Sequence, residues 1–244
     1  MTSHSTMSVA TADMEGDGDV DLFTADMLGQ SYERRQQQVG ARAPLPRDLN
    51  TALGRTQEMQ NTLQLNRGDG TFAEAGELAG LEATGWTWSS RFLDVNLDGY
   101  DDLIVSNGHA FDVQNADAQT KVKMFQNRVD AYEKIRQSIF LYPRLDLHNA
   151  AYRNEGDGTF TEMEEGWGLG EQADVGHGLA TGDFDRDGDL DVVINRLNRP
   201  VGIYRNEGTA RRVSVRLEGE APNTDAVGAE VRVETEGGEV PVQV

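Results

Sequence analysis

The sequence predicts an all-β protein made of repeated four-stranded sheets. Three observations lead to this prediction: an acidic loop of nine residues occurs three times between apolar segments, a Gly-Asp-Gly turn recurs after it, and the 244 residues include 27 glycines but only six prolines. Many glycines and few prolines are typical of short strands joined by tight turns. An apolar content of 37% is enough for a β-rich core.

The acidic loop is the strongest repeat in the chain. Small or apolar residues precede each copy and apolar residues follow it, so we expect a strand on either side. The sixth position is glycine in every copy, where the chain must reverse sharply with little steric room. The copies are residues 13–21 (DMEGDGDVD), 94–102 (DVNLDGYDD) and 183–191 (DFDRDGDLD).

A second turn completes each repeat. It spans residues 65–72 and 152–160, and a shortened copy spans residues 204–208. Its Gly-Asp-Gly core predicts a hairpin between a strand that ends in asparagine and one that begins with Thr-Phe. We expect Asp69 and Asp157 to form these turns and not to bind metal. Two hairpins per repeat make a four-stranded unit.

The repeats are longer than four strands require. The acidic loops start 81 residues (13 to 94) and 89 residues (94 to 183) apart, whereas strands and turns alone need roughly 40 to 50. We therefore expect insertions at about 27–61, which is polar and rich in glutamine, and 109–148. In the insertion at 109–148, apolar residues recur every three or four positions, which predicts an amphipathic helix that packs on the sheet edge or binds a partner. These residues are Val122, Phe125, Val129, Tyr132, Ile135 and Ile139.

The pattern changes after Gly208 to alternating apolar residues, which predicts strands at 213–217, 231–233 and 240–244. We therefore expect two domains: a repeat segment at 1–209 and, at 210–244, the beginning of a small β domain. Because the chain stops inside an alternating run, we expect this second domain to be incomplete.

Composition argues against several functions. With 42 acidic and 22 basic residues, the net charge of −20 repels nucleic acid and anionic lipid. The absence of cysteine excludes disulfides, thiolate metal sites and a cysteine nucleophile. No apolar run reaches the 18 or so residues of a membrane span, and residues 1–10 lack the features of an export signal.

The acidic loops carry the pattern of a calcium site. Calcium takes six to eight oxygen ligands, and alternate residues of a tight loop can direct theirs at one centre. Positions 1, 3, 5 and 9 offer side chains and position 7 its backbone carbonyl. The longer side chain of Glu15 predicts a distorted or weak first site. The candidate ligands are Asp13, Glu15, Asp17, Asp19 and Asp21; Asp94, Asn96, Asp98, Tyr100 and Asp102; and Asp183, Asp185, Asp187, Asp189 and Asp191.

Other interpretations fit these loops less well. An EF-hand needs a bidentate acid at position 12, where this chain has Thr24, Val105 and Ile194. An acidic turn that binds nothing would suit one copy better than three. Magnesium prefers a smaller octahedron and retains its waters. We therefore expect about three Ca²⁺ ions, which stabilise the fold because the crowded carboxylates would otherwise repel one another.

These motifs resemble those of the FG-GAP, or VCBS, repeat family. All three loops match its Asp-x-Asp/Asn-x-Asp/Asn-Gly-x-x-Asp cage apart from Glu15, and Asn-x-Gly-Asp-Gly-Thr-Phe hairpins are typical of its bacterial members. The resemblance implies a partial β-propeller of about three four-stranded blades, as in integrin α-chains and secreted bacterial proteins. It also implies an extracellular or cell-envelope location, and a longer parent chain that supplies the rest of the propeller.

The tail resembles the start of the ASPIC/UnbV domain of cartilage-acidic-protein-like and UnbV-like proteins. The residues that carry this resemblance are 215–219 (VRLEG), Asn223 and 227–231 (VGAEV). Taken together, the resemblances imply a calcium-binding module for adhesion or scaffolding, with a protein or carbohydrate ligand on a propeller face. The alternative is an accessory component of a natural-product biosynthesis or enzyme system.

No catalytic constellation is visible, so we do not expect an enzyme. Ser89 and Ser90 lack a Gly-x-Ser-x-Gly context. The four histidines have no two-histidine metal spacing, and the three tryptophans are expected to pack in the core or, alternatively, to form a platform for a sugar or a partner. These residues are His4, His109, His148 and His177, and Trp86, Trp88 and Trp167.

Overall fold

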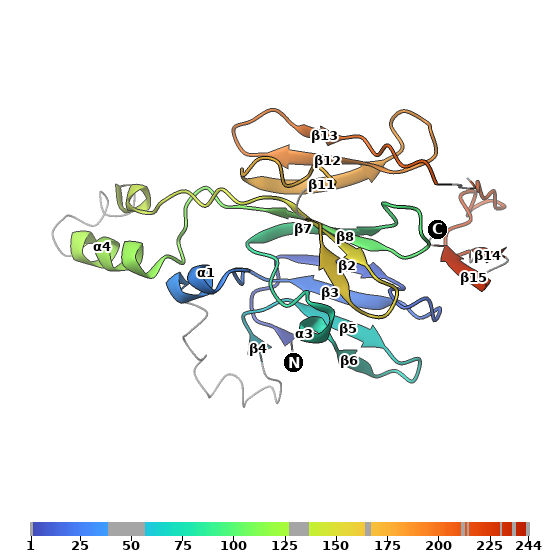
Figure 1. Cartoon of the computed structure of the whole chain (residues 1–244), viewed down its shortest axis with the longest axis horizontal. Helices are drawn as coiled ribbons and strands as arrows, with labels where there is room; N and C mark the ends of the chain where they lie inside the picture. The colour runs from blue at the N-terminus through green and yellow to red at the C-terminus, as the bar shows by residue number, and fades with distance from the viewer. Residues whose placement is uncertain are drawn as a thin grey trace.

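The computed structural model describes residues 2–38, 57–126, 137–163, 167–210, 213, 215–229, 231–235 and 238–242 (Figure 1). Short strands dominate, which confirms the all-β prediction. In chain order the elements are β1 (Thr2–Ser3), β2 (Ser8–Ala12), β3 (Asp21–Ala25), α1 (Tyr32–Gln37), β4 (Gln57–Glu58), β5 (Thr62–Asn66), β6 (Phe72–Glu74), α3 (Gly76–Ala79), β7 (Thr87–Leu93), β8 (Asp102–Asn107), α4 (Ala116–Gln126), the 3₁₀ turn η2 (Ile139–Leu141), β9 (Ala150–Asn154), β10 (Phe160–Glu162), β11 (Gly176–Gly182), β12 (Asp191–Arg196), β13 (Gly202–Tyr204), β14 (Val231–Thr235) and β15 (Gly238–Val242).

The repeats form antiparallel sheets, here called blades. Blade 1 has the strand order β2-β3-β5-β6, blade 2 has β7-β8-β9-β10, and blade 3 has β11-β12-β13. Four strands were expected in every blade, but the described residues give blade 3 only three. The cause is local: the shortened turn at 204–208 lacks the Asp-Gly-Thr-Phe sequence that begins the outer strand in the other two blades.

The blades stack face to face around their first strands. β2 contacts β7, and β7 contacts β11, so these three strands lie side by side while the later strands of each blade extend outward. This is the arrangement of successive propeller blades. The described strands therefore form an open arc of a propeller and do not close into a barrel.

Two apolar cores hold the arc together. Each lies between neighbouring blades, because alternate residues of every strand face opposite sides of its sheet. The core between blades 1 and 2 includes Phe23, Leu63, Phe92, Leu103, Val105 and Tyr152, and the core between blades 2 and 3 includes Leu93, Ile104, Ala151, Leu169, Val192 and Ile194.

The described parts of the two insertions lie at one end of the blades and contact each other (Figure 1). The Arg34 guanidinium, on α1, binds the Asp112 carboxylate through both terminal nitrogens, and the Gln38 side-chain amide donates to Gln114 Oε1 at 2.7 Å. Of the positions predicted to form an amphipathic helix, α4 contains only the first two, the buried Val122 and the partly buried Phe125. Ile139 belongs instead to the separate turn η2, and Val129, Tyr132 and Ile135 lie outside the described residues.

The last part of the chain agrees with the predicted strands only in part. β14 and β15 pair as a hairpin over the predicted Val231, Val233, Val240 and Val242. The strand expected at 213–217 was wrong for residues 215–217, which have no strand partner; Val213 and Val215 are exposed. The boundary near residue 210 stays a prediction.

None of the described helices is both long enough and apolar enough to cross a bilayer.

Candidate metal-binding loops

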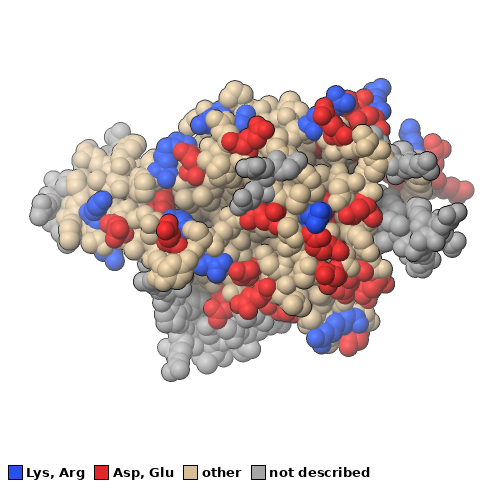
Figure 2. Space-filling view, in the orientation of Figure 1, with Lys and Arg blue, Asp and Glu red and all other residues tan. Residues whose placement is uncertain are grey.

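The three acidic loops lie at the same end of the blades. Each joins the first and second strands of its blade: residues 13–21 join β2 to β3, residues 94–102 join β7 to β8, and residues 183–191 join β11 to β12. This end is opposite the insertions (Figure 1). Figure 2 shows acidic side chains gathered there, as the placement of the loops requires.

The first aspartate of each loop fixes the bend. Its two carboxylate oxygens accept the backbone N–H groups of positions 5 and 6, so the chain winds around the side chain. In the second loop, Asp94 accepts from Asp98 at 3.0 Å and from Gly99 at 2.9 Å. Asp13 and Asp183 make the same pair of contacts in their own loops.

Left-handed backbone at two positions gives the loops their shape. The glycine at position 6 has φ between 91° and 96° in all three copies, where glycine alone carries no Cβ penalty. Position 4 also has positive φ, although Leu97 and Arg186 occupy it in the second and third loops. This winding places positions 1, 3 and 5 of each loop on consecutive turns of the same bend.

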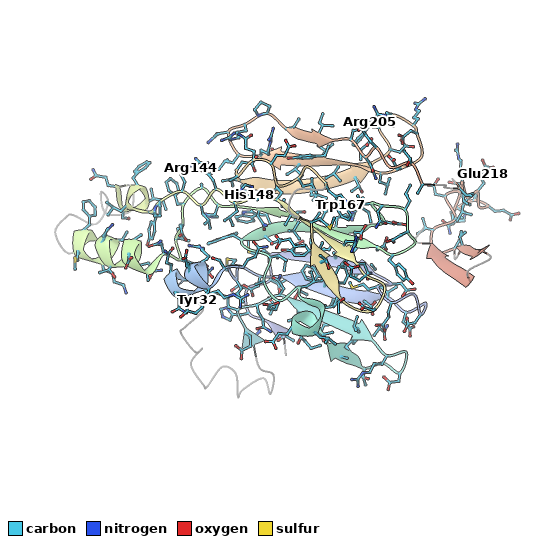
Figure 3. All side chains as sticks on the ribbon, in the orientation of Figure 1. Tyr32, Arg144, His148, Trp167, Arg205 and Glu218 are labelled. Carbon is cyan, nitrogen blue, oxygen red and sulfur yellow. The ribbon has the colours of Figure 1, made fainter. Side chains whose placement is uncertain are left out.

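The third loop brings its carboxylates closest together. Asp183, Asp185 and Asp187 each offer a carboxylate oxygen, and these oxygens lie within 4.8 Å of one another. Oxygens bound to one calcium ion lie no more than about 5 Å apart, twice the metal–oxygen distance, so this donor set fits the ion. Arg205 lies beside it, with its Nε 2.6 Å from Asp185 Oδ2 (Figure 3). A metal ion would have to compete with this guanidinium for Asp185.

The ninth position has a role that the sequence did not reveal. Its aspartate is at most 2% exposed in every loop, and it holds the loop to the second hairpin of the same blade. Asp102 accepts the Val95 N–H at 3.0 Å and the Asn154 N–H at 2.9 Å. The same contacts link Asp21 to Met14 and Asn66, and Asp191 to Phe184 and Asn206. Each carboxylate oxygen keeps a second lone pair, and its metal binding stays a prediction.

Burial and like charge act on these carboxyl groups. Burial raises the pKa of Asp102 to about 7 and that of its neighbour Asp101 to about 6, and nearby loop aspartates add to both shifts. The pKa of Glu15 is also raised, first by burial and then by the charges of Asp21, Asp17 and Asp13. The charges of the other carboxylates in its loop therefore act on Glu15.

An asparagine links each blade to the one before it. The Asn154 side-chain amide donates to the carbonyl oxygen of Met14, in the loop of blade 1, at 3.0 Å. Asn206 donates to the carbonyl oxygen of Val95, in the loop of blade 2, at 2.8 Å. We call these contacts the asparagine clamps. Sequence reasoning missed them, although the recurrence of asparagine before each Gly-Asp-Gly turn was the available signal.

The Gly-Asp-Gly sequences form hairpin turns, as predicted. Asp69 and Asp157 accept hydrogen bonds from the backbone and hydroxyl groups of Thr71 and Thr159, which close the turns and lower the pKa of both aspartates. Gly156, at φ 73°, lies under the Tyr100 ring; a Cβ there would come within 2.8 Å of it. The second turn of a blade thus packs against the seventh position of its acidic loop.

Most tryptophan and histidine rings lie away from the acidic loops. Trp86 is buried, and its ring centroid is 4.4 Å from that of His109. Trp88 contacts His109 on one side and His177 on the other. Trp167 packs against the core between blades 2 and 3, as expected for a core residue (Figure 3). Among the described residues, the one candidate metal cluster is that of the third loop, and it contains no histidine.

Comparisons with known proteins agree with this geometry. The model of the FG-GAP-like repeat matches residues 48–105 and 140–194, which contain the second and third acidic loops. Cartilage acidic protein 1 of Xenopus tropicalis is 34% identical over 68 residues, and its human counterpart is 35% identical over 68 residues. Each match covers 28% of this chain and 10% of the relative, so the similarity spans about a tenth of the length of these proteins.

Proposed function

We propose, from the match of the FG-GAP-like repeat model to residues 48–105 and 140–194, that the chain is a calcium-stabilised, non-catalytic binding module of an extracellular or cell-envelope protein. The observation that carries the proposal is the convergence of Asp183, Asp185 and Asp187 in a loop that recurs twice more at the same end of the arc. The likeness to cartilage acidic protein 1 supports the location and the absence of catalysis.

Calcium would act on stability by relieving charge. The side chains at positions 1, 3, 5 and 9 include four carboxylates in the first and third loops and three in the second. Without a cation, their repulsion opposes the bend that joins the two inner strands of a blade. For a dissociation constant of about 0.1 to 1 mM, typical of extracellular modules, calcium at ten times that concentration adds roughly 1.4 kcal/mol per site.

Thermal melting tests this proposal directly. We expect the melting temperature to rise with millimolar calcium, to fall on chelation, and to respond less to magnesium at the same concentration. The triple variant Asp183→Asn, Asp185→Asn, Asp187→Asn should lose part of the calcium response and keep the response of the other two loops. An equal melting temperature in calcium and in chelator would contradict the proposal.

We also propose that another blade of the same type covers the free face of blade 3. Three cross-strand pairs occupy equivalent positions: Phe23 with Leu63, Ile104 with Ala151, and Val193 with Ile203. The next blade buries the first two pairs to 1% exposure or less, whereas Ile203 is 68% exposed. Phe184 is the second residue of the third acidic loop, as Met14 and Val95 are in the first and second loops. Its carbonyl could therefore accept an asparagine clamp from a following blade, as theirs accept Asn154 and Asn206.

A further inference from the structure

The outer edge of blade 3 is open. β13 pairs with β12 on one side, and no described strand pairs with its other side, where blades 1 and 2 have the outer strands β6 and β10. In blade 2, the N–H of Met163, which follows β10, donates to the Ala151 carbonyl at 2.8 Å, and blade 1 repeats this bond. Ile203 has the place of Ala151 in blade 3, so its carbonyl lies on the open side of β13.

A cavity lies beside this edge, between blades 2 and 3. Its volume is about 380 Å³, within the range of about 300 to 1,000 Å³ that ligand pockets occupy. Tyr204 and Asn206 line it from blade 3, and Trp167 lines it from the connection that follows β10. Their equivalents in blade 2, Tyr152 and Asn154, pair with the outer strand β10. The cavity is therefore next to the place that an outer strand of blade 3 would take.

Between blades 1 and 2, the same place is filled by Phe160. This residue begins β10, pairs with Asn154 and is 9% exposed. The core that contains it also includes Met14, Leu81, Leu103 and Tyr152. The repeat places Val95, Leu169, Val192 and Tyr204 at the equivalent positions, and all four line the cavity. The cavity therefore has the surroundings of a phenylalanine that blade 3 does not supply.

Two equivalent glycines show the difference between the two interfaces. Gly80 and Gly168 each lie eight residues after the first residue of an outer strand, with φ of 76° and 71°. A Cβ on Gly80 would come within 3.4 Å of the Phe160 carbonyl oxygen, whereas a Cβ on Gly168 would have no atom within 4 Å. The space beside Gly168 is thus open where the outer strand of the next blade passes Gly80.

The chain that follows β13 does not provide the missing side chain. After Gly208 it continues as Thr209-Ala210, where the other two blades have Thr-Phe, and residues 205–244 contain no aromatic residue. An aromatic side chain that fills the cavity must therefore come from another segment.

Charge limits which segments fit the edge. An added antiparallel strand would begin opposite Asn206, beside the third acidic loop, because a Cβ on Gly208 would lie 3.5 Å from Asp189 Oδ2. That loop contains five aspartates and one arginine. Neutral or basic residues before the aromatic residue are therefore favoured over acidic ones.

We propose that the open edge of β13 and this cavity bind an extended segment of a partner protein by strand addition, with a phenylalanine opposite Asn206. The segment pairs with β13 as β10 pairs with β9, a backbone N–H of the segment donates to the Ile203 carbonyl, and the phenylalanine ring packs against Trp167 and Tyr204. The proposal rests on the proposed binding function, for which it names a partner class, but it requires no calcium.

Peptide titration tests the proposal on the whole chain. The probe is a dye-labelled peptide with the sequence of residues 158–163 (GTFTEM) preceded by two lysines. We expect a saturable rise in fluorescence anisotropy at peptide concentrations up to the millimolar range. Replacing the phenylalanine of the peptide by alanine should weaken binding at least tenfold, because the buried ring is lost. Replacing the two lysines by glutamates should also weaken it, most clearly at low salt.

Nuclear magnetic resonance and variants locate the bound peptide. The indole N–H signal of Trp167, assigned from Trp167→Phe, and the backbone N–H signals of residues 203–207 should shift on titration. Leu190→Trp enlarges an exposed side chain that lines the cavity and should weaken binding at least tenfold. The matched control is Val20→Trp, because Val20 is the exposed residue at the same position of the first acidic loop and does not line the cavity. Melting curves show whether each variant is folded.

Three results would overturn the proposal: no saturable binding, equal affinity of the phenylalanine and alanine peptides, or full affinity in folded Leu190→Trp. Sedimentation of the chain alone tests another occupant, since a dimer that Leu190→Trp dissociates would assign the edge to a second copy and reject the partner segment. Titrations in calcium and in chelator keep the two proposals apart. Peptide binding without a calcium response would reject only the metal sites, and the reverse result would reject only the added strand.

Discussion

Aspartates within one loop have two different tasks. Asp191 is 2% exposed and accepts the backbone N–H groups of Phe184 and Asn206, whereas Asp185 is exposed and pairs with Arg205. The first side chain therefore stabilises the fold with or without metal. The second contributes little through its exposed ion pair, and in the proposed function it serves as a cation ligand.

This division predicts different effects of two alanine substitutions. Asp191→Ala leaves two N–H groups without acceptors and should lower the free energy of unfolding by about 2 to 4 kcal/mol in chelator. Asp185→Ala should change it by less than about 1 kcal/mol in chelator but reduce the gain on adding calcium. Urea unfolding with and without calcium measures both. Equal losses in chelator would refute the division.

The buried carboxyl groups of the second loop predict how stability depends on pH. The pKa of Asp102 is raised to about 7 and that of Asp101 to about 6, from an ordinary value of 3.8. Because the folded state binds these protons more tightly than the unfolded state, the metal-free protein should lose stability as pH rises from about 4 to about 7. Melting in chelator between about pH 5.5 and pH 8 should show a falling melting temperature.

Calcium should weaken or reverse that trend, because it binds the ionised carboxylates and competes with protons. The variant Asp102→Asn provides the control, since it removes the group with the larger shift and should flatten the slope in chelator. A melting temperature in chelator that rises steadily over the same interval would contradict the assigned shifts.

At the scale of elements, the asparagine clamps connect one blade to the next. Asn154 is 1% exposed and reaches the loop of blade 1, whereas the equivalent Asn66 donates to Val20 of its own blade at 3.3 Å. Both side chains also accept an N–H in their own turn, from Gly156 and Gly68 respectively. The two residues therefore differ mainly in the contact between blades.

Alanine substitution separates the clamp from the turn. Asn154→Ala should cost about 1 to 3 kcal/mol, because it leaves the Met14 carbonyl without this donor at a buried blade interface. Asn66→Ala, which loses the same turn contact, is the matched control and should cost less than half as much. Chemical unfolding of both variants makes the comparison, and similar losses would show that the turn and not the clamp determines stability.

Local patterns explain why much of the fold could be predicted. The acidic loops and the Gly-Asp-Gly turns each form within a short stretch of sequence, so glycine positions and the alternation of the flanking strands reveal them. The clamps join residues 140 and 111 positions apart, and the partners are backbone carbonyls with no side-chain signature. The described residues of blade 3 form no outer strand; the shortened turn at 204–208 was the available signal, but the loss of the strand was not inferred from it.

The cavity at the insertion end, which both insertions and Trp86 line, could not have been predicted in the same way. It depends on how residues 27–38 meet residues 109–115, and neither stretch repeats elsewhere in the chain. Trp86 was expected to pack in the core, and it is buried; its unpaired N–H follows only from the tertiary contacts around it. Periodicity locates the blades, whereas this cavity depends on the insertions between them.

At the scale of the whole molecule, the free face of blade 3 is the feature that another blade would change. Ile203 occupies the position that Leu63 and Ala151 hold in blades 1 and 2, where the next blade covers them. Ile203, which pairs with Val193, is 68% exposed. It therefore lacks the stabilisation that Leu63 and Ala151 gain from burial of their apolar surface. If a further blade is present in the native protein, Ile203 must be inaccessible there.

Cysteine labelling can measure this, because the chain has no cysteine of its own. In the native protein, Ile203→Cys should react with a maleimide at least tenfold more slowly than Leu78→Cys, whose side chain on α3 is 77% exposed. Both variants should react at similar rates after denaturation in urea, which controls for intrinsic thiol reactivity. Equal rates in the folded protein would show that the free face of blade 3 is open to solvent, and that no further blade extends the clamp series at Phe184.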